Sequence, residues 1–262
     1  MAICAMMCGF DTWSEITLFA QEREPWFRRW LSLPGGIPSH DTFNRIFATL
    51  PPASLKSIFQ AWIGDIMGDD KLVGQLAVDG KALRATAKGR GANAVHMVNV
   101  WSTELGMCVG QQKVADKSNE ITAIPELLQL LELKGCLVSI DAMGTQVKIA
   151  DTILKKSGDY LLAVKDNQPS LNTEVKEQFQ AYWDKNETDV SGHGFTEQFD
   201  SEHGRKEHRR CWVLMVDESM PVCQQWKAKT IIAVQAERIE NGKGYDFVRF
   251  YISSRALDAT SA

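Results

Sequence analysis

The chain has 262 residues, of which 44% are hydrophobic and 24% charged, a balance typical of a globular protein with a sizeable core. The net charge of −4 argues against a wholly basic surface but is compatible with a local basic patch. The six cysteines form no CxxC pair, so we interpret them as reduced thiols within apolar segments. Because no stretch of about 20 apolar residues occurs, we expect a cytoplasmic protein without a membrane partner.

Residues 1–70 are predicted to form a helical N-terminal region. Thr12 and Glu15 have the spacing of a capping box, and Ser39 is the expected N-cap of the helix that begins at His40. The apolar segment MAICAMMCGF resembles the middle of a helix whose beginning is missing. We therefore expect the N-terminus to be truncated.

Strands and helices alternate after residue 71, and residues 71–190 are predicted to form one α/β core. The expected strands are 72–79, 95–102, 107–114, 136–141 and 159–165. The expected helices are about 120–133, 145–156 and 169–185. This βββαβαβα order is that of the ribonuclease H-like fold, a mixed sheet. Residues 191–262 return to strands and are predicted to be a strand-rich insertion.

Two apolar strands end on a carboxylate, Asp79 in LVGQLAVDGK and Asp141 in CLVSIDAMGTQ. A right-handed crossover would place strand 136–141 parallel to strand 72–79 and bring both acids to the same end of neighbouring strands. Two carboxylates about 4.8 Å apart repel each other unless a cation lies between them. Their hard oxygen atoms suit Mg²⁺ or Mn²⁺, which can promote phosphodiester chemistry.

These aspartates and the segments around them have alternative interpretations. Both residues could simply begin turns, since Asp before a small residue is common at strand ends. A P-loop does not fit, because five residues separate the glycines of GQLAVDGKA and no Ser or Thr follows Lys81. A G-x-S-x-G elbow and the Rossmann G-x-G-x-x-G opening are also absent from the sequence.

Seven segments carry a resemblance to a known family: GIPSHDTF, AVDGKALR, KSNEITAIPELL, DAMGTQ, GDYLLAVKDNQ, HGRKEHRR and RFYISS. Together they resemble the insertion-sequence DDE transposases that include the H-repeat-associated proteins of Rhs elements. The resemblance covers nearly the whole chain. It implies that Asp79 and Asp141 are the first two catalytic acids and that each ligates Mg²⁺, or Mn²⁺, during cutting and joining of transposon DNA ends.

The chain departs from this family near its end. The family's third acid, a glutamate, lies on a helix beyond the strand that ends in YISS, whereas the sequence stops at Ala262. The resemblance therefore implies a transposase fragment with little or no strand-transfer activity. The alternative function is a catalytically dead DNA-binding or oligomerising fragment.

Several polar and basic residues are candidates for contact with DNA. They follow the strand that ends at Asp79, follow the strand 159–165, or lie in the HGRKEHRR segment. The alternative for residues 81–90 is a solvated loop, and the alternative for HGRKEHRR is an edge strand protected by its charges. The candidates are Lys81, Arg84, Lys88, Arg90, Lys165, Asn167, Gln168, Arg205, Lys206, Arg209 and Arg210. The expected partners are transposon ends and target DNA, and a homodimer is left open.

Overall fold

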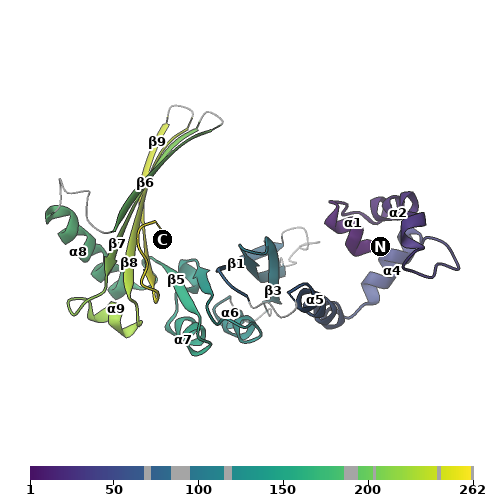
Figure 1. The fold of residues 1–262 in the computed structure, drawn as a ribbon, viewed down its shortest axis with the longest axis horizontal. Helices are drawn as coiled ribbons and strands as arrows, with labels where there is room; N and C mark the ends of the chain where they lie inside the picture. The colour runs from purple at the N-terminus through teal and green to yellow at the C-terminus, as the bar shows by residue number, and fades with distance from the viewer. Residues whose placement is uncertain are drawn as a thin grey trace, which may run out of the picture. The chain divides into compact units, whose positions relative to one another are not determined.

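The structure is a computed structural model that describes residues 1–67, 72–83, 95–114, 120–185, 194–202, 205–240 and 243–260. It divides into two compact units, Met1–Gly68 and Asp69–Ala262 (Figure 1). Among the described residues, no helix has the length and apolar character needed to cross a membrane. All six cysteines are free thiols.

The first unit is helical, as predicted. Its helices are α1 (Ala2–Met7), α2 (Trp13–Glu22), α3 (Glu24–Phe27), α4 (His40–Thr49) and α5 (Pro52–Met67). The predicted capping box is confirmed, because Thr12 Oγ1 accepts from the Glu15 backbone N–H at 3.2 Å and the Glu15 carboxylate accepts from the Thr12 N–H at 3.2 Å. Ser39 caps α4 by accepting from the Thr42 N–H at 3.3 Å.

The second unit is built on one nine-stranded mixed sheet in the order β3-β2-β1-β4-β5-β9-β8-β7-β6. Its strands are β1 (Gln75–Leu83), β2 (Val95–Ser102), β3 (Met107–Lys113), β4 (Leu137–Ile140), β5 (Asp159–Val164), β6 (Phe195–Glu202), β7 (Arg205–Met215), β8 (Thr230–Glu240) and β9 (Lys243–Ser253). Its helices are α6 (Glu120–Gln129), η2 (Ala142–Gly144), α7 (Val147–Lys155), α8 (Pro169–Lys185) and α9 (Pro221–Gln225). The strand-rich C-terminal segment therefore continues the same sheet as the core.

Three strands at the centre of the sheet are parallel. β4 pairs in parallel with both β1 and β5, whereas β2 and β3 form an antiparallel hairpin at one edge. β5 then pairs antiparallel with β9, and β9, β8, β7 and β6 follow as successive antiparallel neighbours. The predicted parallel placement of the two aspartate-bearing strands is confirmed.

The two faces of the sheet differ in burial. Alternate residues such as Leu76, Val138 and Leu162 are fully buried on the face that α6, α7 and α8 cover, which we call the helix face. Phe179 of α8 illustrates this packing, because its ring lies 5.8 Å from that of Phe250 in β9. The residues between them, such as Ala77, are only half-buried and point to the opposite face.

That opposite face is called the carboxylate face because the period of two along each strand places Asp79 and Asp141 on it. Asp79 lies two residues after Ala77, and Asp141 follows β4 with extended backbone angles, two residues after Ser139. Gln75 and Ser139 share this face, because the Gln75 amide donates to Ser139 Oγ at 2.9 Å.

The length of β1 differs from the prediction. The sequence predicts that strand 72–79 ends at Asp79, whereas β1 continues to Leu83. The reason is that β1 has two neighbours of unequal length: β2 pairs with it from Leu76 to Leu83, but the ladder with β4 stops at Val78. Asp79 is therefore inside a strand but just beyond the end of the parallel ladder.

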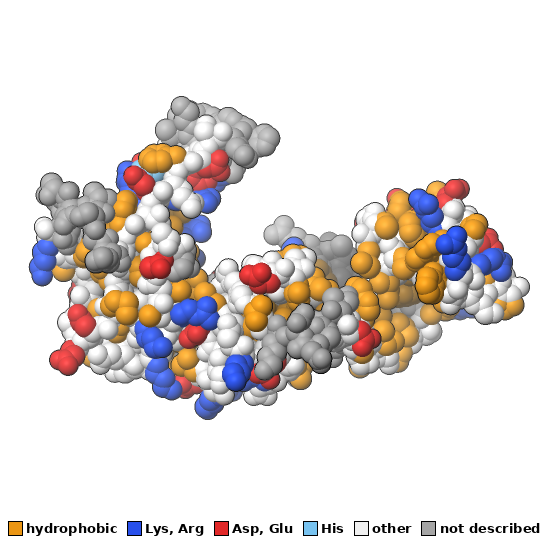
Figure 2. Space-filling view, in the orientation of Figure 1, with side chains coloured by type: hydrophobic (Ala, Val, Ile, Leu, Met, Phe, Trp, Pro, Cys, Tyr) orange, Lys and Arg blue, Asp and Glu red, His pale blue; other side chains and the backbone are white. Residues whose placement is uncertain are grey.

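Strands β8 and β9 extend beyond the end of β5. β5 and β9 pair only as far as Val164 and Phe250, while β9 continues to Lys243 with β8 alone beside it. Because β9 is antiparallel to β5, this extra length projects past the carboxyl end of β5. Figure 1 shows β6 and β9 extending away from the core in this way, and the space-filling view in Figure 2 shows the same projection.

Tyr160 connects β5 with the C-terminal part of the sheet. Its side chain is fully buried, its hydroxyl donates to the Trp226 carbonyl at 2.6 Å, and desolvation raises the pKa of the phenol far above its usual range. A buried carbonyl that loses its donor destabilises the folded state.

We predict that Tyr160→Phe lowers the free energy of unfolding by about 1–3 kcal/mol, because the Trp226 carbonyl is left without a donor. Urea denaturation followed by circular dichroism measures this change. Tyr245→Phe is the matched control, since Tyr245 is 52% exposed. Equal stability of the two variants would contradict the assigned role of the Tyr160 hydroxyl.

Candidate active site

A polar row crosses four strands on the carboxylate face. Val78 of β1 pairs with Ile140 of β4, so Asp79 and Asp141, the next residue of each strand, continue the same parallel register. On the other side Asp79 pairs with Asn99 of β2, and Asn99 pairs with Gln111 of β3. The order across the sheet is therefore Asp141, Asp79, Asn99, Gln111.

The two acids of this row follow paired residues of neighbouring strands. Adjacent strands lie about 4.8 Å apart, and both side chains extend from the same face. Asp79 and Asp141 are both exposed, so water solvates them and no buried partner neutralises their charge. Two carboxylates in this relation repel each other, and a bound cation would remove that repulsion.

Asn99 and Gln111 were missed by the reasoning from sequence. The Gln111 amide donates to Asn99 Oδ1 at 2.8 Å, which fixes the Asn99 amide beside Asp79. A signal was present in VHMVNVWS, because Asn99 stands between Val98 and Val100, both fully buried. A polar residue on the solvent-facing side of a strand is a candidate for the same site when the neighbouring strand is expected to carry a catalytic acid.

Asp141 also begins a tight turn, the short helix η2. Its Oδ1 accepts from the Gly144 backbone N–H at 3.3 Å. Gly144 is required by packing, since a Cβ there would overlap the Ile140 side chain. The following residue, Thr145, is fully buried and donates from Oγ1 to the Ala163 carbonyl at 2.6 Å, which ties the turn to β5.

Two side chains predicted to contact DNA hold this turn. The Asn167 amide donates to the Ala142 carbonyl at 2.6 Å, and the Gln168 amide donates to the Thr145 carbonyl at 2.9 Å. These residues follow β5, as predicted, and lie beside the residues that follow Asp141. Because their donors are used within the protein, we interpret them first as supports of the Asp141 turn, while contact with DNA stays a prediction.

Gly80 has a specific neighbour on the helix face. A Cβ at Gly80 would overlap the carboxylate of Glu120, the first residue of α6. The Glu120 carboxylate therefore lies close to the backbone beside Asp79, and a larger residue at position 80 would require the Glu120 side chain to move. Gly80 itself lies inside β1, so no turn begins there.

The basic residues predicted to contact DNA do not all lie near Asp79 and Asp141. Lys81 is exposed on the carboxylate face two residues after Asp79, and Lys165 is exposed just beyond β5. Arg84, Lys88 and Arg90 lie outside the described residues. Arg205 and Lys206 belong to β7, but their side chains also lie outside what is described.

Arg209 and Arg210 are brought to opposite faces of β7. Arg209 points to the carboxylate face and pairs with Glu207 at 2.9 Å, whereas Arg210 points to the helix face and pairs with Glu237 at 2.7 Å. The two residues therefore do not form one continuous patch. Each charge is partly offset by its carboxylate partner.

The donor set near Asp79 and Asp141 fits a hard divalent cation in its chemistry, because both ligands are carboxylates. Within the described parts of the chain, however, no group of three or more His, Cys, Asp or Glu side chains could hold a metal ion. The site thus offers two carboxylates with neutral amide neighbours.

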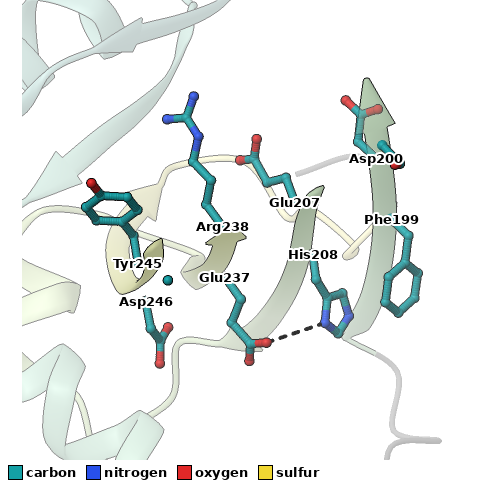
Figure 3. Close-up of a pocket in the computed structure, with 10 residues that line it drawn as sticks. Phe199, Asp200, Glu207, His208, Glu237, Arg238, Tyr245 and Asp246 are labelled. Carbon is teal, nitrogen blue, oxygen red and sulfur yellow. Dashed lines mark ion pairs between the residues drawn. The ribbon is translucent and has the colours of Figure 1, made fainter. Parts of the chain in front are cut away.

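A hollow of about 670 Å³ lies elsewhere, at the far end of β6–β9 (Figure 3). Arg238 and Glu207 extend to one side of the sheet there, and Glu237 and His208 to the other, where the dashed line joins the last two. This hollow lies around the tip of the strands and does not include the Asp79–Asp141 row.

The chain matches known proteins over nearly all of its length. Residues 74–254 match the family described as "Transposase DDE domain", and residues 1–63 match the family described as "DDE_Tnp_1-associated". The putative transposase YncI of Escherichia coli O157:H7 and the H repeat-associated putative transposase YhhI of E. coli strain K12 are each 38% identical over 99% of this chain, covering 67% and 69% of those proteins. A protein of Xanthobacter autotrophicus described as "Uncharacterized protein in dhlA 3'region" is 36% identical over 98% of this chain and 86% of its own length.

Among solved structures, the piggyBac transposase synaptic complex with hairpin DNA aligns with a TM-score of 0.39 and 11% identity, over 94% of this chain and 52% of that chain. The family match, which covers more than half of the chain, and the 38% identity to two transposases lead to one conclusion. This chain belongs to the DDE transposase family, the family of the H-repeat-associated insertion-sequence proteins.

Proposed function

We propose that this protein carries the first two metal-binding acids of a polynucleotidyl transferase that cuts and joins the DNA ends of an insertion sequence. The observation that supports the proposal is the parallel pairing of Val78 with Ile140, the residues that directly precede Asp79 and Asp141. Its family membership supports the same reaction class. Transposon ends and target DNA are the proposed substrates.

The proposed core is ribonuclease H-like. The strand order β3-β2-β1-β4-β5, with β2 antiparallel and β4 parallel to β1, supports this assignment. In such a core the acids are carried by rigid strands, so the separation between them is fixed before a ligand binds.

Asp79 and Asp141 would hold Mg²⁺ or Mn²⁺, which supplies charge stabilisation for phosphoryl transfer when bound. The residues of the chain would position the two carboxylates. β1 and β4 fix the two carboxylates, and Asn99 and Gln111 place neutral amides next to Asp79 where a further carboxylate would add repulsion. Thr145, through its hydrogen bond to Ala163, anchors the turn on which Asp141 lies.

DNA would reach these acids along the carboxylate face. Lys81 and Lys165 are exposed near the row, and each can contact a backbone phosphate in a way that does not depend on sequence. In a cut, a P–O bond to water forms as the P–O bond to the leaving strand breaks. In strand transfer, a DNA hydroxyl takes the place of water, loses its proton, and the leaving oxygen gains one.

We predict that Asp79→Asn and Asp141→Asn each weaken Mn²⁺ binding by at least about tenfold, because a neutral amide replaces an anionic ligand. Mn²⁺ titration followed by electron paramagnetic resonance measures this loss. Asp184→Asn on the exposed surface of α8 is the matched control and should bind like the unmodified protein. The same three variants are then assayed for Mn²⁺-dependent cleavage of duplex DNA carrying an end of the element.

Loss of Mn²⁺ binding in both acid variants but not in the control supports the proposal. Equal Mn²⁺ binding by all of these proteins would overturn it. DNA retention on a gel without metal-dependent cleavage in any of them would favour the alternative of a non-catalytic DNA-binding protein.

We predict that Asn167→Ala weakens Mn²⁺ binding by about tenfold, the effect expected when a support of a metal ligand is removed. It deletes the donor to the Ala142 carbonyl and should lower the free energy of unfolding by only about 1 kcal/mol. Gln180→Ala, which deletes an exposed amide bonded to Asp184, is the control. Unchanged Mn²⁺ affinity with the expected small loss of stability would show that the turn does not position Asp141.

A further inference from the structure

Every second residue at the free end of β9 lies on the carboxylate face. Tyr251 pairs with Ala163, which is the cross-strand neighbour of Asp141 in the register of β4 and β5. Side chains alternate along β9, so Arg249, Phe247 and Tyr245 lie on the same face as Tyr251. Figure 3 agrees with this alternation at the far end, because Tyr245 and Asp246 extend to opposite sides of the sheet.

These side chains form an exposed platform of two aromatic rings and one guanidinium, which we call the β9 platform (Tyr245, Phe247 and Arg249). Tyr245 is 52% exposed, Phe247 is 37% exposed, and Arg249 is exposed. The guanidinium carbon of Arg249 lies 4.8 Å from the centroid of the Phe247 ring, so the two groups are stacked rather than directed into the core. Flat aromatic and guanidinium surfaces on a strand are the groups on which unpaired bases stack.

In the register of the sheet, the β9 platform lies on the same face as the candidate active site. Two strand-to-strand steps separate Asp141 from Tyr251, which corresponds to about 10 Å. Lys165 follows β5 at the position that faces Arg249 in the extended register, so a lysine and an arginine stand between the acids and the aromatic rings. Among the described residues, neither cation has a carboxylate within 4.0 Å.

The two faces of strands β6–β9 also differ in charge. Among the described side chains, the carboxylate face carries three arginines and two acids, and the helix face carries one arginine and three acids. The first set is Arg209, Arg238, Arg249, Asp200 and Glu207, and the second is Arg210, Glu197, Glu237 and Asp246.

A small pocket of about 140 Å³ lies where β5 and β9 separate, next to α8. Lys165, Lys176, Arg249 and Asn172 are among its lining residues. Asn172 is 5% exposed; its amide donates to Asp166 at 2.8 Å, but its Oδ1 has no partner. The lining also includes the Asp166 carboxylate, so this pocket carries charges of both signs.

We propose that the β9 platform binds single-stranded DNA next to the active site. This inference rests on the proposed function and adds to it the path of an unpaired strand: phosphates contact Lys165 and Arg249, and bases stack on Phe247 and Tyr245. Duplex DNA does not fit the aromatic part of this surface, because its bases are already stacked on one another. The cationic excess on this face matches the charge of the strand.

The test is binding of a fluorescein-labelled 12-nucleotide oligo-dT, measured by fluorescence anisotropy in EDTA, with a duplex of equal length in parallel. The double variant Tyr245→Ala with Phe247→Ala should bind oligo-dT about tenfold or more weakly, because stacking of bases is lost. Arg249→Ala should weaken binding and reduce the dependence of log Kd on log salt by about one phosphate contact. Phe199→Ala is the matched control, since Phe199 is 74% exposed but stacks on His208 on the helix face.

Weaker oligo-dT binding by the platform variants, with Phe199→Ala unchanged, supports the proposal. Unchanged binding by the platform variants, or an equal loss in Phe199→Ala, overturns it. A duplex preference that does not depend on the two rings also overturns it. The assay contains no divalent metal, so its result is independent of whether Asp79 and Asp141 bind a cation, and circular dichroism confirms that each variant is folded.

Discussion

The parallel ladder between β1 and β4 is the constraint on which the remaining structure of the site depends. It ends at Val78 and Ile140, so the next residue of each strand is an aspartate on the same face. A slip of one residue would place the two acids on opposite faces, because side chains alternate along a strand. The buried side chains of Val78 and Ile140 on the helix face oppose such a slip, since it would turn one of the two out to water.

The neighbours of this ladder hold the acids from two directions. On the β1 side, Asn99 and Gln111 extend the polar row, and Glu120 packs against Gly80 behind it. On the β4 side, buried and half-buried hydrogen bonds from Thr145 and Asn167 fix the turn that follows Asp141. The same sheet continues into β9, which brings an aromatic and basic surface to the carboxylate face. The position of the acids, their supporting contacts and the proposed path of DNA all involve this one sheet.

Much of this could be read from the sequence. The alternation of strands and helices predicted the core, and the caps at Thr12 and Ser39 were identified correctly because capping depends on local chemistry. The length of β1 was not predictable, because it is set by its partner β2 and not by its own apolar pattern. The supporting roles of Asn167 and Gln168 were missed for a similar reason: their acceptors are 25 and 23 residues away along the chain.

A crystal structure of this protein soaked in Mn²⁺, with anomalous diffraction data, tests the central claim most directly. The account predicts an anomalous peak within coordination distance of carboxylate oxygens from both Asp79 and Asp141, on the face that carries Asn99 and Gln111. An anomalous peak bound elsewhere, or two aspartates whose carboxylates point into separate surroundings, would contradict it.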